Sequence, residues 1–230
     1  IVGDEKDNKE FTRCIKSIEK YVDHIFINYN GKSKVFPYYR SKVCQTTIKH
    51  FEWNKDFSQA RNETFSMITD SGINFDWAFW IDADDELVGG ENIQQMLSDD
   101  NKDSAAIFLK YVYGYDSKEN KEFVTQYRER FLNLSEKWTW INPVHEICQT
   151  RVGVKMRELD FADKYGIKIL HHRGSFEDEG VSIDNVTRTR NREILNASLT
   201  KNPNDLRSKY YLANEIAYEC FKEFKNPTKE

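Results

Sequence analysis

The sequence predicts an α/β fold that continues into a helical C-terminal part. Short apolar runs alternate with amphipathic helical patterns through most of the first 180 residues, as they do in open α/β folds. One of these runs, at residues 75–81, stops abruptly at a cluster of acidic side chains. From Ile183 onward the apolar spacing is wholly helical. A sheet with ligand-binding loops, followed by a smaller helical part, is therefore expected.

Length and composition exclude several classes of function. A chain of 230 residues holds one large domain, or one domain with a small appendage. The net charge is −4 without basic blocks, so no nucleic-acid partner is expected. No run reaches the roughly 18 apolar residues of a membrane helix, so no transmembrane segment is expected. Four scattered cysteines match neither a zinc pattern nor a disulfide framework, which favours a reducing, cytoplasmic location.

The first 30 residues predict a βαβ unit. Ile1 and Val2 are interpreted as the end of a strand, and residues 3–7 form a polar turn. Apolar residues three and four apart in residues 11–22 predict an amphipathic helix. Residues 25–29 predict a second short strand. The loops that follow the two strands are natural places for a nucleotide.

The next segment predicts a strand at residues 44–51 and then a helix. Ser58 is a candidate N-cap for this helix. Arg61 in its first turn lies at the unfavourable end for the helix dipole, which favours an anionic partner such as a diphosphate. The alternative is a surface ion pair of Arg61 with Asp56 or Glu63.

The apolar run at residues 75–81 is long enough for a strand buried on both faces. Four acidic side chains follow it within five positions: Asp82, Asp84, Asp85 and Glu86. Such a cluster repels itself unless a cation neutralises it, and carboxylate oxygens suit Mg²⁺ or Mn²⁺. The alternative is a strand that ends in a solvated acidic turn.

The remaining segments complete the predicted sheet and the helical part. A short helix near Met96, strands at residues 105–112 and 167–174, and two helices separated by a break at residues 202–205 are expected. Residues 123–134 alternate polar with aromatic residues. The last strand ends on His171 and His172. An aromatic segment at residues 138–147 ends on the pair His145–Glu146.

Three motifs carry a resemblance to a known family. They are Trp53-x-x-Asp56-Phe57-Ser58-x-Ala60-Arg61-Asn62, Trp80-Ile81-Asp82-Ala83-Asp84-Asp85 and Pro143-Val144-His145-Glu146. In order and spacing the chain resembles the family 2 glycosyltransferases over roughly residues 1 to 180. The resemblance implies a GT-A fold, the Rossmann-like fold of nucleotide-diphospho-sugar transferases, for residues 1–180. Residues 181–230 resemble the first unit of a tetratricopeptide-like repeat and could contact a protein partner; an ordinary helical hairpin is the alternative.

The resemblance implies a metal-dependent, inverting, hexosyltransferase-like enzyme. It would move a sugar from a nucleotide-diphosphate sugar, with a UDP-sugar favoured, to a hydroxyl of a glycan or protein acceptor. Two alternatives stay open at this point. One is a nucleotidyltransferase, although no Gly-rich basic phosphate loop is visible, and the other is a catalytically silent binding module of the same fold.

The resemblance also implies roles for individual residues. Asp82 and Asp84 match the DxD motif, whose carboxylates hold Mn²⁺ or Mg²⁺ against the diphosphate. His171 or His172 would complete the metal site, and strand alternation places the two on opposite faces. The residues expected to contact the nucleotide sugar are Ile1, Val2, Asp4, Glu5, Asn28, Arg61, Asp82 and Ala83.

On the acceptor side, Glu146 and His145 are the candidate catalytic residues, with Glu146 as the general base. Asp178 or Glu177 is the reserve candidate for the base. The alternative for Glu146 is a structural ion pair with an arginine such as Arg130. One departure from the family concerns the second strand, where residues 28–33 replace the expected Asp and Gly-Ser/Thr, and this leaves the identity of the base open.

Overall fold

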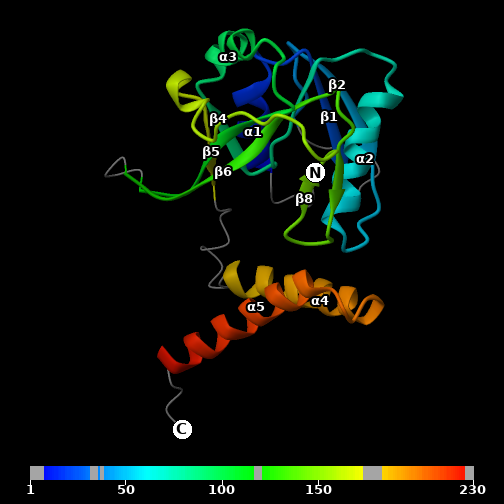
Figure 1. Ribbon diagram of the computed structural model, residues 1–230, viewed down its shortest axis with the longest axis vertical. Helices are drawn as coiled ribbons and strands as arrows, with labels where there is room; N and C mark the ends of the chain where they lie inside the picture. The colour runs from blue at the N-terminus through cyan, green and yellow to red at the C-terminus, as the bar shows by residue number, and fades with distance from the viewer. Residues whose placement is uncertain (1–7, 32–35, 37–38, 117–120, 173–182, 226–230) are drawn as a thin grey trace. The chain divides into compact units, whose positions relative to one another are not determined.

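The computed structural model describes residues 8–31, 36, 39–116, 121–172 and 183–225 (Figure 1). The chain divides into two compact units. The first unit comprises Ile1–Trp53, Ala60–Trp140 and Cys148–Gly174, and the second comprises Asn54–Gln59, Ile141–Ile147 and Ser175–Glu230. The second unit therefore combines the C-terminal helices with two earlier short segments that the sequence interpretation assigned to the glycosyltransferase-like domain.

Strands and helices alternate along the first part of the chain, as the sequence predicts. Their order is α1 (Asn8–Ile18), β1 (His24–Tyr29), β2 (Gln45–His50), α2 (Phe57–Asp70), β3 (Trp77–Phe79), β4 (Asp85–Val88), η2 (Gly90–Asn92), α3 (Ile93–Asp100), β5 (Ala106–Asp116), β6 (Lys121–Asn133), β7 (Thr139–Ile141), β8 (Ile147–Gln149), η3 (Asp163–Tyr165) and β9 (Lys168–His171). Two longer helices follow, α4 (Ile183–Lys201) and α5 (Leu206–Lys225).

The strands of the first unit form a mixed arrangement. β1 and β2 pair in parallel, and a five-stranded sheet has the order β3-β6-β5-β9-β4. In this sheet only the β5–β9 pairing is parallel, while β3–β6, β5–β6 and β4–β9 are antiparallel. The architecture confirms a mixed α/β fold with a C-terminal helical pair. The finer assignment to the GT-A fold stays a prediction.

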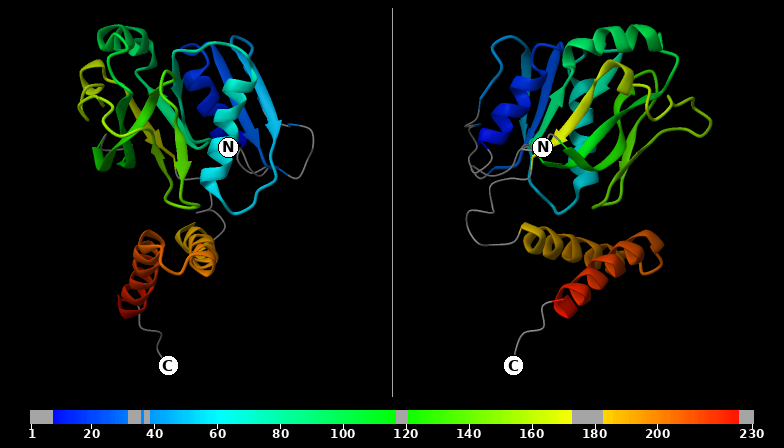
Figure 2. Two further views of the ribbon diagram at one scale, coloured as in Figure 1. Left: turned by 45° about the vertical axis from the view of Figure 1, so that its right-hand side comes forward. Right: turned by 90° about the vertical axis from the view of Figure 1, so that its left-hand side faces the viewer.

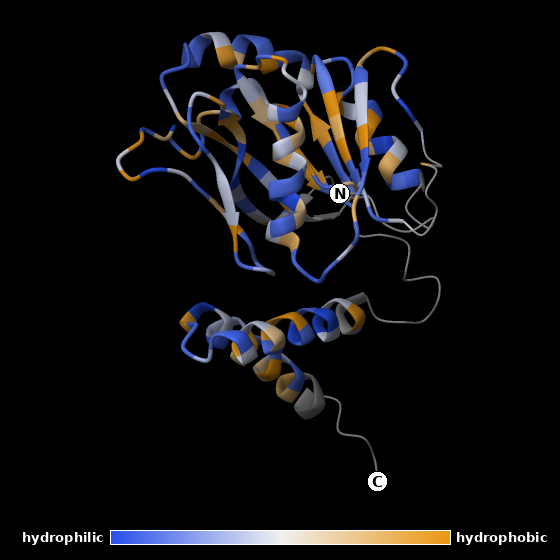
Figure 3. Ribbon diagram, turned by 90° about the vertical axis from the view of Figure 1, so that its right-hand side faces the viewer, coloured by the Kyte–Doolittle hydropathy of each residue, from blue (hydrophilic) through white to orange (hydrophobic). Residues whose placement is uncertain are grey.

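The core of the first unit lies on the central strands. Ile107, Leu109 and Ile169 are completely buried there, and α1 adds an apolar face that includes Phe11 and Ile15. Figure 3 shows the apolar residues concentrated on the strands inside this unit. Burial of this kind is the main source of the unit's stability.

A cavity of about 390 Å³ lies in the same unit, lined by α1, β1, α2 and the segment around β3. Its wall combines apolar side chains with polar ones that include Arg61, whereas Asp82, Asp84 and Asp85 do not line it. The acidic cluster therefore lies outside this cavity, at the ends of the strands.

The boundaries of two predicted elements differ from those observed. The apolar run at residues 75–81 forms only the three-residue strand β3, in which Ala78 is buried and Trp77 and Phe79 are half-buried. The prediction that Ser58 caps α2 is wrong, because the helix begins at Phe57. Asp56 is the cap: its Oδ1 accepts hydrogen bonds from the Gln59 N–H at 3.0 Å and the Ser58 hydroxyl at 2.7 Å.

In the second unit, α4 and α5 form an antiparallel pair, shown in Figure 2. Ser208 on α5 meets Ser198 on α4, and Glu215 further along α5 meets Arg188 near the start of α4. Asp205 caps α5 by accepting hydrogen bonds from the N–H groups of Arg207 and Ser208. Within the described part of the chain, none of the helices has the length and apolar character needed to span a membrane. All four cysteines are free thiols, as the sequence indicates.

Candidate functional site

The acidic cluster occupies the turn between β3 and β4. Trp80 continues the pairing of β3 with β6, since its N–H donates to the Arg130 carbonyl at 3.1 Å. The chain then turns sharply, and the Asp85 N–H donates to the Asp82 carbonyl at 3.0 Å. Asp82 and Asp84 therefore lie on the turn, whereas Asp85 is the first residue of β4.

Asp85 is a buried structural centre. Its side chain is fully buried and accepts hydrogen bonds from the Tyr111 hydroxyl at 3.1 Å and from Arg130 Nη2 at 3.2 Å. Its Oδ1 also lies 3.0 Å from His171 Nδ1. Arg130 is itself 1% exposed, and its guanidinium lies 3.8 Å from the Trp80 ring centre. A buried carboxylate of this kind depends on such cationic and hydroxyl partners.

Asp82 is held by two arginines. Its Oδ1 is 2.9 Å from Arg61 Nη2, and its Oδ2 is 3.8 Å from Arg130 Nη1. Burial raises the pKa of Asp82, but the two guanidiniums outweigh burial and hold this pKa well below its usual range. Arg61 lies over the rings of Trp80 and Trp140 at 4.4 and 4.9 Å. The anionic partner expected for Arg61 is thus, in this structure, a carboxylate of the cluster.

Asp84 is the most accessible of the three aspartates, with a side chain that is 44% exposed. Burial of the remainder raises its pKa to about 6, with the charges of Asp82 and Asp85 adding to the rise and His171 opposing it. Its Oδ2 lies 3.8 Å from His171 Nδ1. Asp84 is therefore the aspartate of the three that is most accessible to a ligand from solvent.

The structure distinguishes the two histidines at the end of β9. Burial lowers the pKa of His171, but its hydrogen bond to Asp85 and the charge of Asp84 outweigh burial and raise it above the ordinary value. His171 also stacks on Tyr113, with ring centres 4.7 Å apart. The ring of His172 instead reaches Glu86, with Nε2 at 2.7 Å from Oε2.

Asp84, Asp85 and His171 form a group that could hold a metal ion. One ligand atom from each of them lies within 4.8 Å of the others. Two carboxylate oxygens and one imidazole nitrogen suit a divalent cation that accepts both donor types. This set shares Asp84 and His171 with the four predicted ligands. In the described structure Asp82 pairs with Arg61 and His172 with Glu86 instead.

The other predicted nucleotide-sugar contacts have different surroundings. Asn28 is completely buried, and its amide Nδ2 donates to the Ala60 carbonyl at 3.1 Å, one residue before Arg61. Ala83 is half-buried and packs against the core of the first unit. Six candidate residues lie outside the described part of the chain: Ile1, Val2, Asp4, Glu5, Glu177 and Asp178.

The acceptor-side candidates His145 and Glu146 belong to the second unit. The backbone of His145 has a φ of 53°, and its ring stacks on Tyr211 of α5 with centres 4.0 Å apart. Burial lowers the pKa of His145 more than the nearby charges of Glu215 and Glu146 raise it. Glu146 is half-buried. Arg130, the ion-pair partner considered for Glu146, is bonded to Asp85.

Sequence reasoning missed the residues that support these groups. Tyr111 and Arg130 were not expected to hold Asp85, nor Tyr211 and Arg207 to hold His145. An available signal was the place of Arg130 directly before the apolar pair Phe131–Leu132, since an arginine that is buried with such neighbours requires an anion. No protein-family model matches the chain, and no curated protein matches its sequence.

Proposed function

We propose that this protein is a metal-dependent, inverting glycosyltransferase that moves a sugar from a nucleotide-diphosphate sugar to an acceptor hydroxyl. The observation that carries the proposal is the accessible carboxylate of Asp84 beside His171 and the buried Asp85. Such a group at a strand end, next to two arginines, is suited to a metal-bound diphosphate.

On the donor side, different residues would bind the metal ion and the diphosphate. Asp84 and His171 would hold Mn²⁺ or Mg²⁺, with Asp85 fixed behind them by Arg130 and Tyr111. When bound, the ion would neutralise charge on the leaving diphosphate. Arg61 is suited to the same diphosphate, because its planar guanidinium is already oriented by two tryptophan rings.

On the acceptor side, Glu146 is the proposed general base, following the resemblance of Pro143–Glu146 to the late family motif. A base that takes the proton of the attacking hydroxyl contributes roughly 10²–10⁴-fold in rate. The acceptor would be a glycan or protein hydroxyl, and a UDP-sugar is the favoured donor. The identities of the acceptor and of the donor both come from the resemblance to the family 2 glycosyltransferases.

Calorimetric titration of UDP and a panel of UDP-sugars, with and without Mn²⁺, tests the donor site. We expect UDP and at least one UDP-sugar to bind only when Mn²⁺ is present. We also expect slow hydrolysis of that UDP-sugar, which releases UDP. Asp84→Asn should abolish the Mn²⁺-dependent binding of UDP. Asp70→Asn is the control and should leave this binding unchanged, because Asp70 is an exposed residue at the end of α2.

The same titrations, extended to nucleoside triphosphates, separate the competing classes. A nucleotidyltransferase would bind a nucleoside triphosphate and release pyrophosphate instead of UDP. A silent binding module would bind the UDP-sugar without any turnover. Metal-independent binding in the wild-type protein would contradict the role of Asp84 and His171.

A further inference from the structure

The loop of residues 142–146, between β7 and β8, has an unusual backbone. Two residues other than glycine lie in the left-handed region, Asn142 with a φ of 70° and His145 with a φ of 53°. For a side chain such as histidine this conformation is rare and unfavourable. It persists only when the surroundings impose it, and such positions gather at functional sites.

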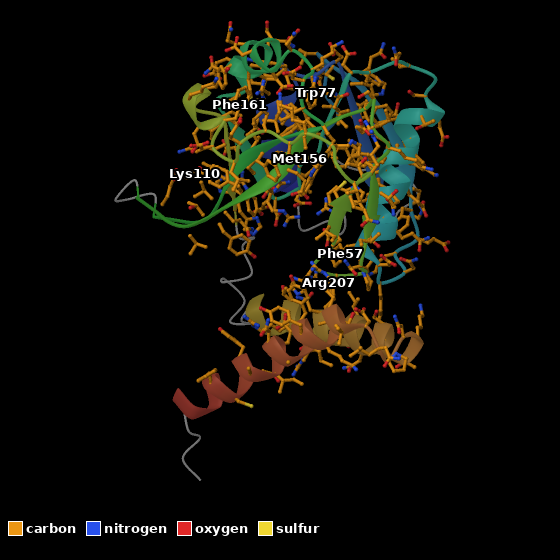
Figure 4. All side chains as sticks on the ribbon, viewed as in Figure 1. Phe57, Trp77, Lys110, Met156, Phe161 and Arg207 are labelled. Carbon is orange, nitrogen blue, oxygen red and sulfur yellow. The ribbon has the colours of Figure 1, made fainter. Side chains whose placement is uncertain are left out.

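Helix α5 supplies the contacts that impose it. Arg207 Nη2 donates a hydrogen bond of 2.8 Å to the carbonyl oxygen of His145 (Arg207 is labelled in Figure 4). Tyr211, one helical turn further on, stacks on the His145 ring with an interplanar angle of 15°. The guanidinium of Arg207 lies over the Tyr211 ring, 4.9 Å from its centre. The backbone and the ring of His145 are therefore held by two neighbouring residues of one helix face.

A buried charge network fixes this helix face in turn. Glu215, again one turn along α5, has a side chain that is 7% exposed and lies 3.9 Å from His145 Nε2. Its two oxygens are bonded to Arg188 at 2.6 Å and Asn191 at 3.3 Å, both on α4. These bonds to both carboxylate oxygens hold Glu215 in one geometry, although His145 Nε2, Arg188 Nε and Arg207 Nε make no hydrogen bond among the described residues. The register of α4 against α5 thus determines where the His145 ring lies.

The chemistry of His145 and Glu146 follows from this packing. Because burial lowers its pKa, His145 is neutral near pH 7 and does not act there as a cation. The His145 ring also stacks against the Tyr211 ring. Glu146 directly follows His145 in the sequence, so the direction of the Glu146 side chain depends on the backbone conformation of His145.

We propose that α5 positions the general base: Arg207, Tyr211 and Glu215 hold His145, and His145 sets the direction of Glu146. His145 is then a positioning residue. The inference rests on the proposed function, in which Glu146 accepts the proton of the acceptor hydroxyl.

The test compares Tyr211→Leu, which removes the stacking ring, with Tyr211→Phe, which keeps it. Phe221→Leu on the same helix is the matched control, because Phe221 is 69% exposed, whereas the adjacent Tyr210 packs its ring against Tyr211. With a UDP-sugar and Mn²⁺, Tyr211→Leu should lower kcat roughly ten- to a hundredfold, the cost of a small misplacement of a catalytic group. The KM for the donor should be unchanged, and Tyr211→Phe should restore most of the turnover.

Proton NMR of His145 supplies a readout that needs no activity. In the wild type its ring protons should be shifted upfield by Tyr211, and its pKa should lie below 6.5. Tyr211→Leu should remove the upfield shift and move the pKa toward the ordinary value, whereas Tyr211→Phe should keep both. These expectations hold whatever reaction the protein catalyses.

The outcomes separate the two proposals. A wild-type protein that binds and turns over no nucleotide sugar contradicts the proposed function, and the role of α5 in catalysis falls with it. An active wild type whose Tyr211→Leu variant keeps normal kcat contradicts the positioning role alone. Equal losses of kcat in Tyr211→Leu and Phe221→Leu would also contradict the positioning role, because they would indicate general damage to the helix.

Discussion

The acidic turn after β3 and the His145–Glu146 loop achieve a fixed geometry by different physical means. In the acidic turn, Asp85 and Arg130 are charges of opposite sign that are both almost completely buried. In the loop, a neutral histidine is held by an aromatic stack and one hydrogen bond to its carbonyl oxygen. Both segments depart from regular secondary structure, and both are supported by residues far away in the sequence.

The difference indicates where a substitution should act. Removing one partner of a buried ion pair leaves the other charge uncompensated, so the main cost is in folding stability. Removing a stacking or backbone contact leaves no buried charge behind, so the main cost is in orientation and therefore in rate. Substitutions in the acidic turn should therefore lower stability and metal affinity, whereas substitutions around the His145–Glu146 loop should lower turnover.

The largest effect is expected for Arg130→Met. The change leaves Asp85 buried without its guanidinium and should lower the free energy of unfolding by about 3–5 kcal/mol. Urea denaturation measures it. Arg128→Met on the same strand is the control, because the Arg128 side chain is 30% exposed and its removal leaves no fully buried charge behind. Similar losses in both variants would contradict the central position of Arg130.

Glu146→Gln should act on rate and not on stability. The amide keeps the shape of the side chain but accepts no proton, so kcat should fall by roughly 10²-fold or more while the affinity for the donor stays the same. Steady-state kinetics and a parallel donor titration measure the two quantities. If the variant instead unfolds more easily and keeps its turnover per folded molecule, Glu146 is a structural residue, and Asp178 becomes the candidate base.

His171→Gln and His172→Gln should separate the two histidines. His171 belongs to the group with Asp84 and Asp85, so its loss should weaken Mn²⁺ binding by about tenfold or more. His172 pairs with Glu86 instead, so its loss should leave Mn²⁺ affinity nearly unchanged. Calorimetry with Mn²⁺ alone measures both. A larger effect of His172→Gln would assign the metal to the opposite face of β9.

The smallest effect is the pH dependence contributed by His145. Its pKa in the folded protein lies below its ordinary value, so the unfolded chain binds a proton first as the pH falls. Its contribution to stability is therefore present above about pH 6.5 and decreases as the pH falls below that value. His145→Asn, which tolerates the left-handed backbone, should remove this part of the pH dependence. Identical pH profiles for the two proteins would show that the ring is not buried as described.

Local patterns in the sequence predict most of the elements for physical reasons that act over a few residues. Apolar spacing alone places α1, β1 and the α4–α5 pair, because each must bury one face. The abrupt change from apolar to acidic residues at Asp82 likewise indicates a candidate site. The cap of α2 was misplaced at Ser58 because Asp56 and Ser58 are both good capping residues, and spacing does not separate them.

The partners of each charge were decided only by the tertiary structure. Asp85 meets Arg130 and His171 across 45 and 86 positions of sequence, and strand pairing alone determines which side chains come together at that distance. Alternation predicts that His171 and His172 face opposite ways, but the pairing of β4 with β9 decides which one meets Asp85. His145 is likewise joined to Tyr211 by helix packing. Residue types and local spacing are thus determined by the sequence alone, whereas contacts between distant segments depend on the packing of the whole chain.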